Sequence, residues 1–123
     1  MRIKALYDGV REQIENCSPH FMSVERLYFG QNRTTAEAVW QVRGAILLLG
    51  AQYRLPIIEP KPSEVKLTVC GDGTAEKRQV QLMIQQLLNL PEIPRPDDTA
   101  DALGIALAGL AIVRSPQYAY GRR

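Results

Sequence analysis

A long apolar helix between two short strand-like segments most constrains what this chain can fold into. Residues 35–53 have helical spacing, and the second half of the segment, which contains AILLLGA, is apolar on nearly every side. Thr34 or Thr35 can cap this helix, and Glu37 is placed to satisfy its first free amides. Because a helix that is apolar all round must be covered on two sides, we expect it to pack against its own sheet and against a partner subunit.

Two short strands are predicted on either side of this helix. FMSVERLYF, residues 21–29, follows a turn signal and predicts a strand that ends near Glu25, and LPIIEP predicts a second strand closed by Pro60. The order strand, helix, strand favours parallel pairing through a right-handed crossover. Because two strands do not make a stable sheet that is covered on both faces, we expect further strands before residue 1.

The rest of the chain predicts helices joined by short loops. The periodicity of apolar residues and the Pro and Gly signals place these helices at residues 2–16, 62–69, 75–90 and 98–113. A length of 123 residues suits one domain, which we expect over residues 1–113. Residues 114–123 lack periodicity and are predicted to form a flexible tail.

The composition excludes some classes of protein. A net charge of +2 creates no strong overall field for nucleic acid, although most of the 15 basic residues are arginine, which binds phosphate in a bidentate way. Cys17 and Cys70 have neither metal-site nor redox-motif spacing and are expected to be reduced thiols. With no signal peptide and no apolar run long enough for a bilayer, we expect a cytoplasmic protein that does not contact membranes.

Acidic residues are crowded at the start of the last predicted helix, in the stretch RPDDTADALGIAL. Asp98 and Asp101 are three residues apart and so share one helix face, which is also the spacing of a simple capping box. Glu25 lies in an otherwise apolar strand, where a charge needs a partner or a task, unless it pairs with Arg26 or is exposed at the strand end. Three such carboxylates at a sheet edge would suit Mg²⁺ or Mn²⁺ and two-metal phosphodiester cleavage.

Three segments of the chain together resemble the RuvC family of Holliday-junction resolvases. They are VERLYF with QNRTTAEAVWQVRGA, then SEVKLTVCGDGTAEKRQVQLMI, then DDTADALGIAL, and the resemblance extends from about residue 2 to about residue 112. It implies an α/β fold of the RNase H-like (RuvC) type, with an incomplete sheet and a mostly helical remainder. It also implies a Mg²⁺-dependent endonuclease (Mn²⁺ being possible) that hydrolyses four-way junction DNA during recombination and repair.

The resemblance assigns roles to individual residues. Glu25, Asp98 and Asp101 match three of the four acidic residues that bind metal and catalyse cleavage in the family. Residues expected to contact DNA are Tyr28, Lys66, Gly71, Gly73 and Lys77. Apart from the resemblance, the tyrosine suits strand packing, the lysines suit a solvated surface, and the glycines suit a tight turn. The implied partners are four-way junction DNA, a second copy bound through the 35–53 helix, and a branch-migration helicase.

The chain also departs from the family pattern. The family's opening strand, with a DPG-like motif whose Asp is the first metal ligand, is not found, and Trp40 stands where a small glycine is usual. Three explanations stay open: a truncated or misassigned start, a stable remnant without catalysis, or strands supplied by another chain. We therefore expect weak or no cleavage by this polypeptide alone. The alternative function is a catalytically dead DNA-binding or dimerisation module, in which the helices at 62–69 and 75–90 imitate a helix-turn-helix.

Overall fold

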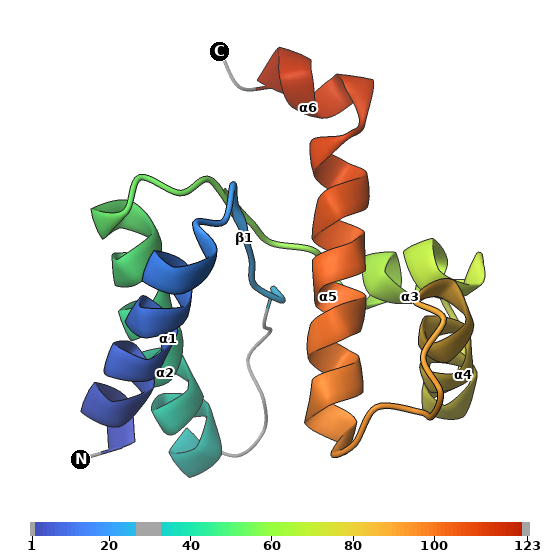
Figure 1. The fold of residues 1–123 in the computed structure, drawn as a ribbon, viewed down its shortest axis with the longest axis horizontal. Helices are drawn as coiled ribbons and strands as arrows, with labels where there is room; N and C mark the ends of the chain where they lie inside the picture. Colours follow the sequence, from blue (N-terminus) through green and yellow to red (C-terminus); the bar gives the residue numbers. More distant parts are fainter. Residues whose placement is uncertain (1, 27–32, 122–123) are drawn as a thin grey trace. The chain divides into compact units, whose positions relative to one another are not determined.

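The computed structural model describes residues 2–26 and 33–121, which form helices and one small sheet (Figure 1). The elements, in chain order, are α1 (Arg2–Cys17), β1 (Met22–Ser23), α2 (Arg33–Gln52), β2 (Ile57–Ile58), α3 (Pro62–Cys70), α4 (Lys77–Leu87), α5 (Asp97–Val113) and α6 (Pro116–Gly121). The predicted order of helix, strand, helix, strand and three helices is confirmed up to α5, and α6 is an additional helix that was not predicted. None of the described helices is long and apolar enough to cross a membrane.

The chain divides into two compact units. The first comprises Met1–Met22 and Leu27–Ile57, and the second comprises Ser23–Arg26 and Ile58–Arg123. Each short strand passes from the first unit into the second. The first residue of β1 and of β2 belongs to the first unit, and the second residue belongs to the second unit. The single domain over residues 1–113 stays a prediction.

In the first unit, α1 and α2 pack along each other and run in the same direction (Figure 1). Ile14 and Leu49 are buried, and the Tyr7 hydroxyl donates a hydrogen bond to the Gln52 side chain. Gly50 lets the Ile57 side chain approach α2 closely, since a Cβ at residue 50 would lie 2.8 Å from Cδ1 of Ile57. The amphipathic pattern of the first predicted helix is thus used to bury one helix face on another.

Helix α2 differs from the prediction at its start. It begins at Arg33, so Thr34 and Thr35 lie inside the helix and the predicted cap is wrong, because both residues are already helical. Leu49 is fully buried, whereas Leu48 is 52% exposed, so the two sides of this apolar helix have different environments. Packing of the exposed side on a partner subunit stays a prediction.

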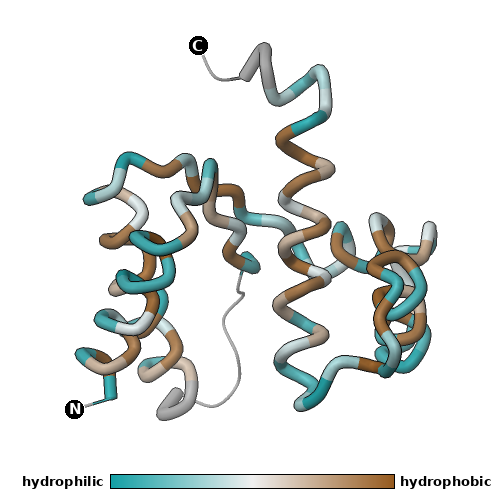
Figure 2. The backbone as a smooth tube through the Cα atoms, viewed as in Figure 1, coloured by the Kyte–Doolittle hydropathy of each residue, from teal (hydrophilic) through white to brown (hydrophobic). Residues whose placement is uncertain are grey.

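In the second unit, α3 and α4 pack against α5 (Figure 1). The face of α5 that they cover is lined by small residues at four-residue spacing, Ala100, Gly104 and Ala108, all of which are buried. A Cβ at Gly104 would lie 3.1 Å from Cγ1 of Val65 and 3.4 Å from Cδ1 of Ile84. Small side chains on α5 therefore let the neighbouring helices come close, and Figure 2 shows hydrophobic stretches along much of this helix.

Parallel pairing continues beyond β1 inside the second unit. The Val24 amide donates to the Ile58 carbonyl at 2.9 Å, and the Arg26 amide donates to the Pro60 carbonyl at 2.8 Å. The predicted parallel pairing is confirmed. Since side chains alternate along a strand, this ladder fixes the face to which Ser23 and Glu25 belong.

Two helix limits in the second unit differ from the prediction. Helix α4 spans Lys77–Leu87, shorter than 75–90, because Ala75 is buried in the preceding loop and Asn89 has a left-handed conformation (φ 54°) that ends the helix. The predicted flexible tail contains helix α6 from Pro116 to Gly121, which packs against α5.

Candidate active site

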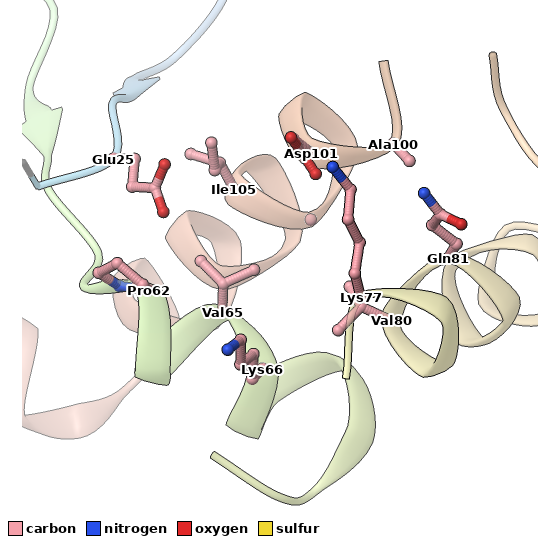
Figure 3. Close-up of a pocket in the computed structure, with 11 residues that line it drawn as sticks. Glu25, Pro62, Val65, Lys66, Lys77, Val80, Gln81, Ala100, Asp101 and Ile105 are labelled. Carbon is pink, nitrogen blue, oxygen red and sulfur yellow. The ribbon is translucent and has the colours of Figure 1, made fainter. Parts of the chain in front are cut away.

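A pocket of the second unit gathers acidic and basic side chains from four segments of the chain (Figure 3). Glu25 follows β1, Lys66 belongs to α3, Lys77 to α4 and Asp101 to α5. The cavity volume is about 310 Å³. Since one liquid water occupies roughly 30 Å³, a hydrated ion or a phosphate group fits this space.

Strand alternation directs Glu25 toward α5. The Ser23 hydroxyl donates a hydrogen bond of 2.7 Å to the Ile105 carbonyl on α5, and Glu25, two residues further on, lies on the same face of the extended segment. The pKa of Glu25 is raised above its ordinary value, first by burial and second by the negative charge of Asp101. The two carboxylates are therefore close enough to repel each other across the pocket.

Helix α5 holds its acidic residues for a reason other than capping. Its N-cap is Pro96, no side chain caps it, and Asp97 and Asp98 lie in its first turn, where negative charge suits the helix dipole. The capping-box interpretation of Asp98 and Asp101 is thus wrong, because the helix already begins at Asp97. Asp101 lies one turn further on and lines the pocket with Ile105.

The three predicted carboxylates are not all gathered in one place. Glu25 and Asp101 line the same pocket, whereas Asp98 lines a second pocket formed by α4 and the segment before α5. Among residues 2–26 and 33–121, no three His, Cys, Asp or Glu side chains are close enough together to hold a metal ion. Two carboxylates nevertheless fit Mg²⁺, which proteins commonly hold with one or two carboxylates while it keeps several waters.

Lys77 faces the acidic side of the pocket. Figure 3 shows its side chain extending from α4 toward Asp101. Its ammonium nitrogen lies 3.3 Å from Oδ2 of Asp97, and this hydrogen bond, followed by the charges of Asp97 and Asp101, raises the pKa of Lys77. Lys66 lines the same pocket from α3. Both lysines predicted from the family resemblance are therefore at the pocket that holds Glu25 and Asp101.

The predicted glycines lie in the turn after α3. Gly71 ends α3 in a left-handed conformation (φ 73°), and its amide donates to the Leu67 carbonyl at 2.8 Å. Asp72 stabilises the turn by accepting hydrogen bonds from the Thr74 amide and hydroxyl. The left-handed end of α3 explains why residue 71 is a glycine. DNA contact by Gly71 and Gly73 stays a prediction. Tyr28 lies outside the described residues.

Sequence reasoning missed two residues beside the pocket. The Asp97 carboxylate binds Lys77 and also accepts a hydrogen bond of 3.3 Å from the Gln81 side-chain amide, and Gln81 is 9% exposed. Gln81 lines both pockets. The available signals were the first aspartate of the DD pair and a glutamine four residues after Lys77 on an amphipathic helix.

The chain is similar to proteins of one family over most of its length. The family model described as Crossover junction endodeoxyribonuclease RuvC matches residues 1–109. Proteins of that name from Desulforamulus reducens and Moorella thermoacetica are 49% and 53% identical over 107 and 106 residues, which cover 87% and 86% of this chain. These segments cover 66% and 64% of the two relatives, so the chain spans about two thirds of their length.

Solved structures agree with the sequence comparisons. Thermus thermophilus RuvC has a TM-score of 0.84 and 33% identity, covering 92% of this chain and 68% of that one. A structure of T. thermophilus RuvC in complex with Holliday junction substrate also has a TM-score of 0.84 and 33% identity, covering 89% of this chain and 68% of that one. The fold of the described residues is therefore similar to that of a protein that binds a four-way junction.

Proposed function

Because this chain belongs to the RuvC family of crossover junction endodeoxyribonucleases, we propose that it serves the metal-dependent hydrolysis of four-way DNA junctions in recombination and repair. The observation that carries this proposal is the pocket that Glu25 and Asp101 both line, with Lys66 and Lys77 at its wall. A carboxylate pair between lysines suits a cation bound beside a phosphodiester. A cytoplasmic location follows from the same role.

Each group at the pocket has a distinct task in this proposal. Glu25 and Asp101 would hold Mg²⁺, or Mn²⁺, and Asp98, which lines the second pocket, would join them only by turning its side chain toward the ion. A bound divalent ion supplies acidification of the attacking water and stabilisation of the leaving oxygen. Burial and, second, repulsion from Asp101 raise the pKa of Glu25, and a bound cation would offset both, so binding the cation and ionising Glu25 favour each other.

The basic and turn residues would position the DNA. Lys66 and Lys77 place two cationic side chains at the same pocket, where they can contact phosphates on either side of the cleaved bond. Gly71 and Gly73 would allow the backbone of the turn to approach DNA, and Tyr28 would stack at the junction, as the family resemblance implies.

Metal binding tests the proposal directly. Mg²⁺ is expected to raise the melting temperature of the wild-type chain, and Asp101→Asn or Glu25→Gln should weaken Mg²⁺ binding about tenfold or more, because each removes one of two facing ligands. Asp8→Asn is the matched control, since Asp8 pairs with Lys4 on the surface of the first unit. If Mg²⁺ binding is equally strong in all four proteins, the assigned site is wrong.

Junction binding and cleavage form the second part of the test. We expect the wild-type chain to bind a synthetic four-way junction more tightly than a linear duplex of equal length, and to cleave it weakly or not at all with Mg²⁺ present. Full cleavage that Asp101→Asn abolishes would contradict the expectation of weak activity while supporting the site. Failure to prefer the junction would contradict the substrate.

A dimerisation or scaffold role is the alternative, and exposed apolar residues on α2 favour it. Val39, Trp40 and Leu48 are 39%, 38% and 52% exposed, and the ring of Trp40 lies 5.8 Å from the Arg43 guanidinium. Exposed apolar groups on one helix are typical of protein contact surfaces. The second copy is proposed to bind here, whereas the branch-migration helicase rests on the family resemblance alone.

The helix-turn-helix form of the alternative has less support. Residues 71–76 separate α3 from α4, which is longer than the three- or four-residue turn of that motif. Ala75, at the point where base-reading residues would be needed, is 3% exposed. Sequence-specific binding to linear duplex without a metal ion would favour this form over the nuclease.

A further inference from the structure

The Asp97 carboxylate joins the start of α5 to one face of α4. Its Oδ2 lies 3.3 Å from the Lys77 ammonium nitrogen, and its Oδ1 accepts a hydrogen bond of 3.3 Å from the Gln81 side-chain amide. Lys77 and Gln81 are four residues apart on α4 and both line the pocket of Glu25 and Asp101. One anionic group outside the proposed metal ligands therefore holds two pocket residues.

The two contacts of Asp97 differ in how easily they can be exchanged. The side chains of Lys77 and Asp97 are 59% and 66% exposed, and an ion pair this exposed stabilises a protein only slightly. Gln81, in contrast, is buried. Lys77 can thus leave Asp97 at little cost, while the hydrogen bond from Gln81 keeps the carboxylate in place.

The position of Lys77 makes this exchange relevant to DNA. Its side chain reaches toward Asp101, so its ammonium group lies where a phosphodiester beside a metal-bound pocket would need a cation (Figure 3). An ammonium group is a compact point charge with three hydrogen-bond donors, and it can pair with either a carboxylate or a phosphate. In the described structure, Asp97 is the carboxylate that pairs with this ammonium group.

We propose that Asp97 is a positioning residue that holds Lys77 at the pocket in the DNA-free protein and competes with a DNA phosphodiester for its ammonium group. This proposal rests on the proposed function, because it takes junction DNA as the ligand. Asp97 therefore lowers affinity for DNA and keeps Lys77 from binding other anions. The competition requires Lys77, which distinguishes it from simple repulsion between Asp97 and phosphate.

A double-mutant cycle measures the competition. The dissociation constant of a fluorescently labelled synthetic four-way junction would be compared at low salt in wild type, Asp97→Asn, Lys77→Gln and the double variant. Asp97→Asn should tighten binding about three- to fivefold when Lys77 is present and less than about twofold in the Lys77→Gln background. Glu92→Gln, which removes another exposed carboxylate just before α5, should change binding less than about twofold.

Other outcomes of the cycle would overturn the proposal. Equal tightening by Asp97→Asn in both backgrounds would mean that Asp97 acts only through its charge. Weaker binding by Asp97→Asn, with an unchanged melting temperature, would mean that Asp97 helps Lys77 to reach DNA.

A measurement without DNA separates this proposal from the proposed function. The ¹⁵N relaxation of the Lys77 ammonium group reports its mobility, which should increase in Asp97→Asn and stay unchanged in Glu92→Gln. If wild type does not bind the junction, the proposed function fails, whereas the relaxation data still decide whether Asp97 holds Lys77. Unchanged mobility in Asp97→Asn would overturn the positioning role even if junction binding is tight.

Discussion

The two compact units place their charged side chains in different ways. In the first unit, Asp8 pairs with Lys4 at 2.7 Å and with Arg11 at 3.7 Å along the exposed face of α1. In the second unit, Glu25, Lys77 and Asp101 come from three segments and face one pocket. On α1, an acidic side chain is paired with basic neighbours of the same helix. In the pocket, packing places two carboxylates and a lysine together, so both like and unlike charges are close. Only the latter arrangement suits a site that binds a cation and an anion together.

Both units leave apolar side chains exposed, and Leu67 and Leu87 of the second unit are 57% and 54% exposed. On α2 of the first unit the apolar residues Val39, Trp40 and Leu48 are exposed. In the second unit the pocket is lined by ionisable side chains beside an apolar wall that includes Val65 and Ile105. Self-association through α2 of the first unit and chemistry at the pocket of the second are the two roles proposed above. The following variants test each side of this comparison.

Core truncation should have the largest effect and should act on each unit separately. Leu49 and Ile84 are both 0% exposed, one in each unit, so Leu49→Ala and Ile84→Ala should each lower the free energy of unfolding by about 2–5 kcal/mol. Urea unfolding measures the loss. Amide hydrogen exchange should increase in α1 and α2 for Leu49→Ala and in α3 to α5 for Ile84→Ala. Equal increases throughout the chain for both variants would show that the units unfold as one.

An acidic residue on α2 should disrupt self-association. Leu48 is 52% exposed on this helix, and Leu48→Asp should weaken the proposed homodimer by about tenfold or more, since a buried charge at an interface is costly. Leu87→Asp is the control, because Leu87 is 54% exposed on α4 of the second unit. Sedimentation velocity gives the dimer dissociation constants, and an equal effect of both changes would argue against α2 as the interface.

Loss of a pocket lysine should have a moderate effect on DNA binding. Lys66→Gln should raise the dissociation constant for a four-way junction about three- to tenfold at low salt and reduce the salt slope by about one, because one phosphate contact is lost. Lys4→Gln removes the same charge from the first unit and should change neither quantity measurably. If the two variants behave alike, the pocket has no special role in binding the junction.

The smallest expected effect is a pH dependence of opposite sign in the two units. Burial and Asp101 raise the pKa of Glu25, so the folded state binds more protons there than the unfolded state, and stability falls as pH rises from 4.5 through the raised value. Lys4 lowers the pKa of Asp8, so its contribution is present above pH 3.8 and is lost as pH falls through the lowered value.

Thermal unfolding between pH 3 and pH 7 tests both signs. Glu25→Gln should remove part of the decrease in stability with rising pH, and Asp8→Asn should remove part of the loss on acidification. The same pH profile in Glu25→Gln and wild type would mean that Glu25 does not ionise in this range, contrary to its placement beside Asp101.

Much of the fold could be predicted because its signals are local. Apolar spacing and the Pro and Gly signals identified the helices around α1, α3 and α5, and the RuvC family and fold type expected from the sequence are confirmed. The predicted start of α4 was wrong because Ala75, a good helix former, is buried in the loop before it. The predicted cap of α2 was wrong because helical structure begins one or two residues earlier.

The sequence by itself determined which residue types could form a site, since Glu25 in an apolar strand and Asp101 near a helix start were conspicuous in their segments, whereas the two lysines were assigned through the family resemblance. Only the tertiary structure decided which of them meet. Asp98 shares a helix face with Asp101 yet lines a different pocket, and Asp97 binds Lys77 and Gln81, 20 and 16 positions away. Helix periodicity is a property of one segment, whereas these pairings depend on how α4 packs against α5, which no local pattern contains.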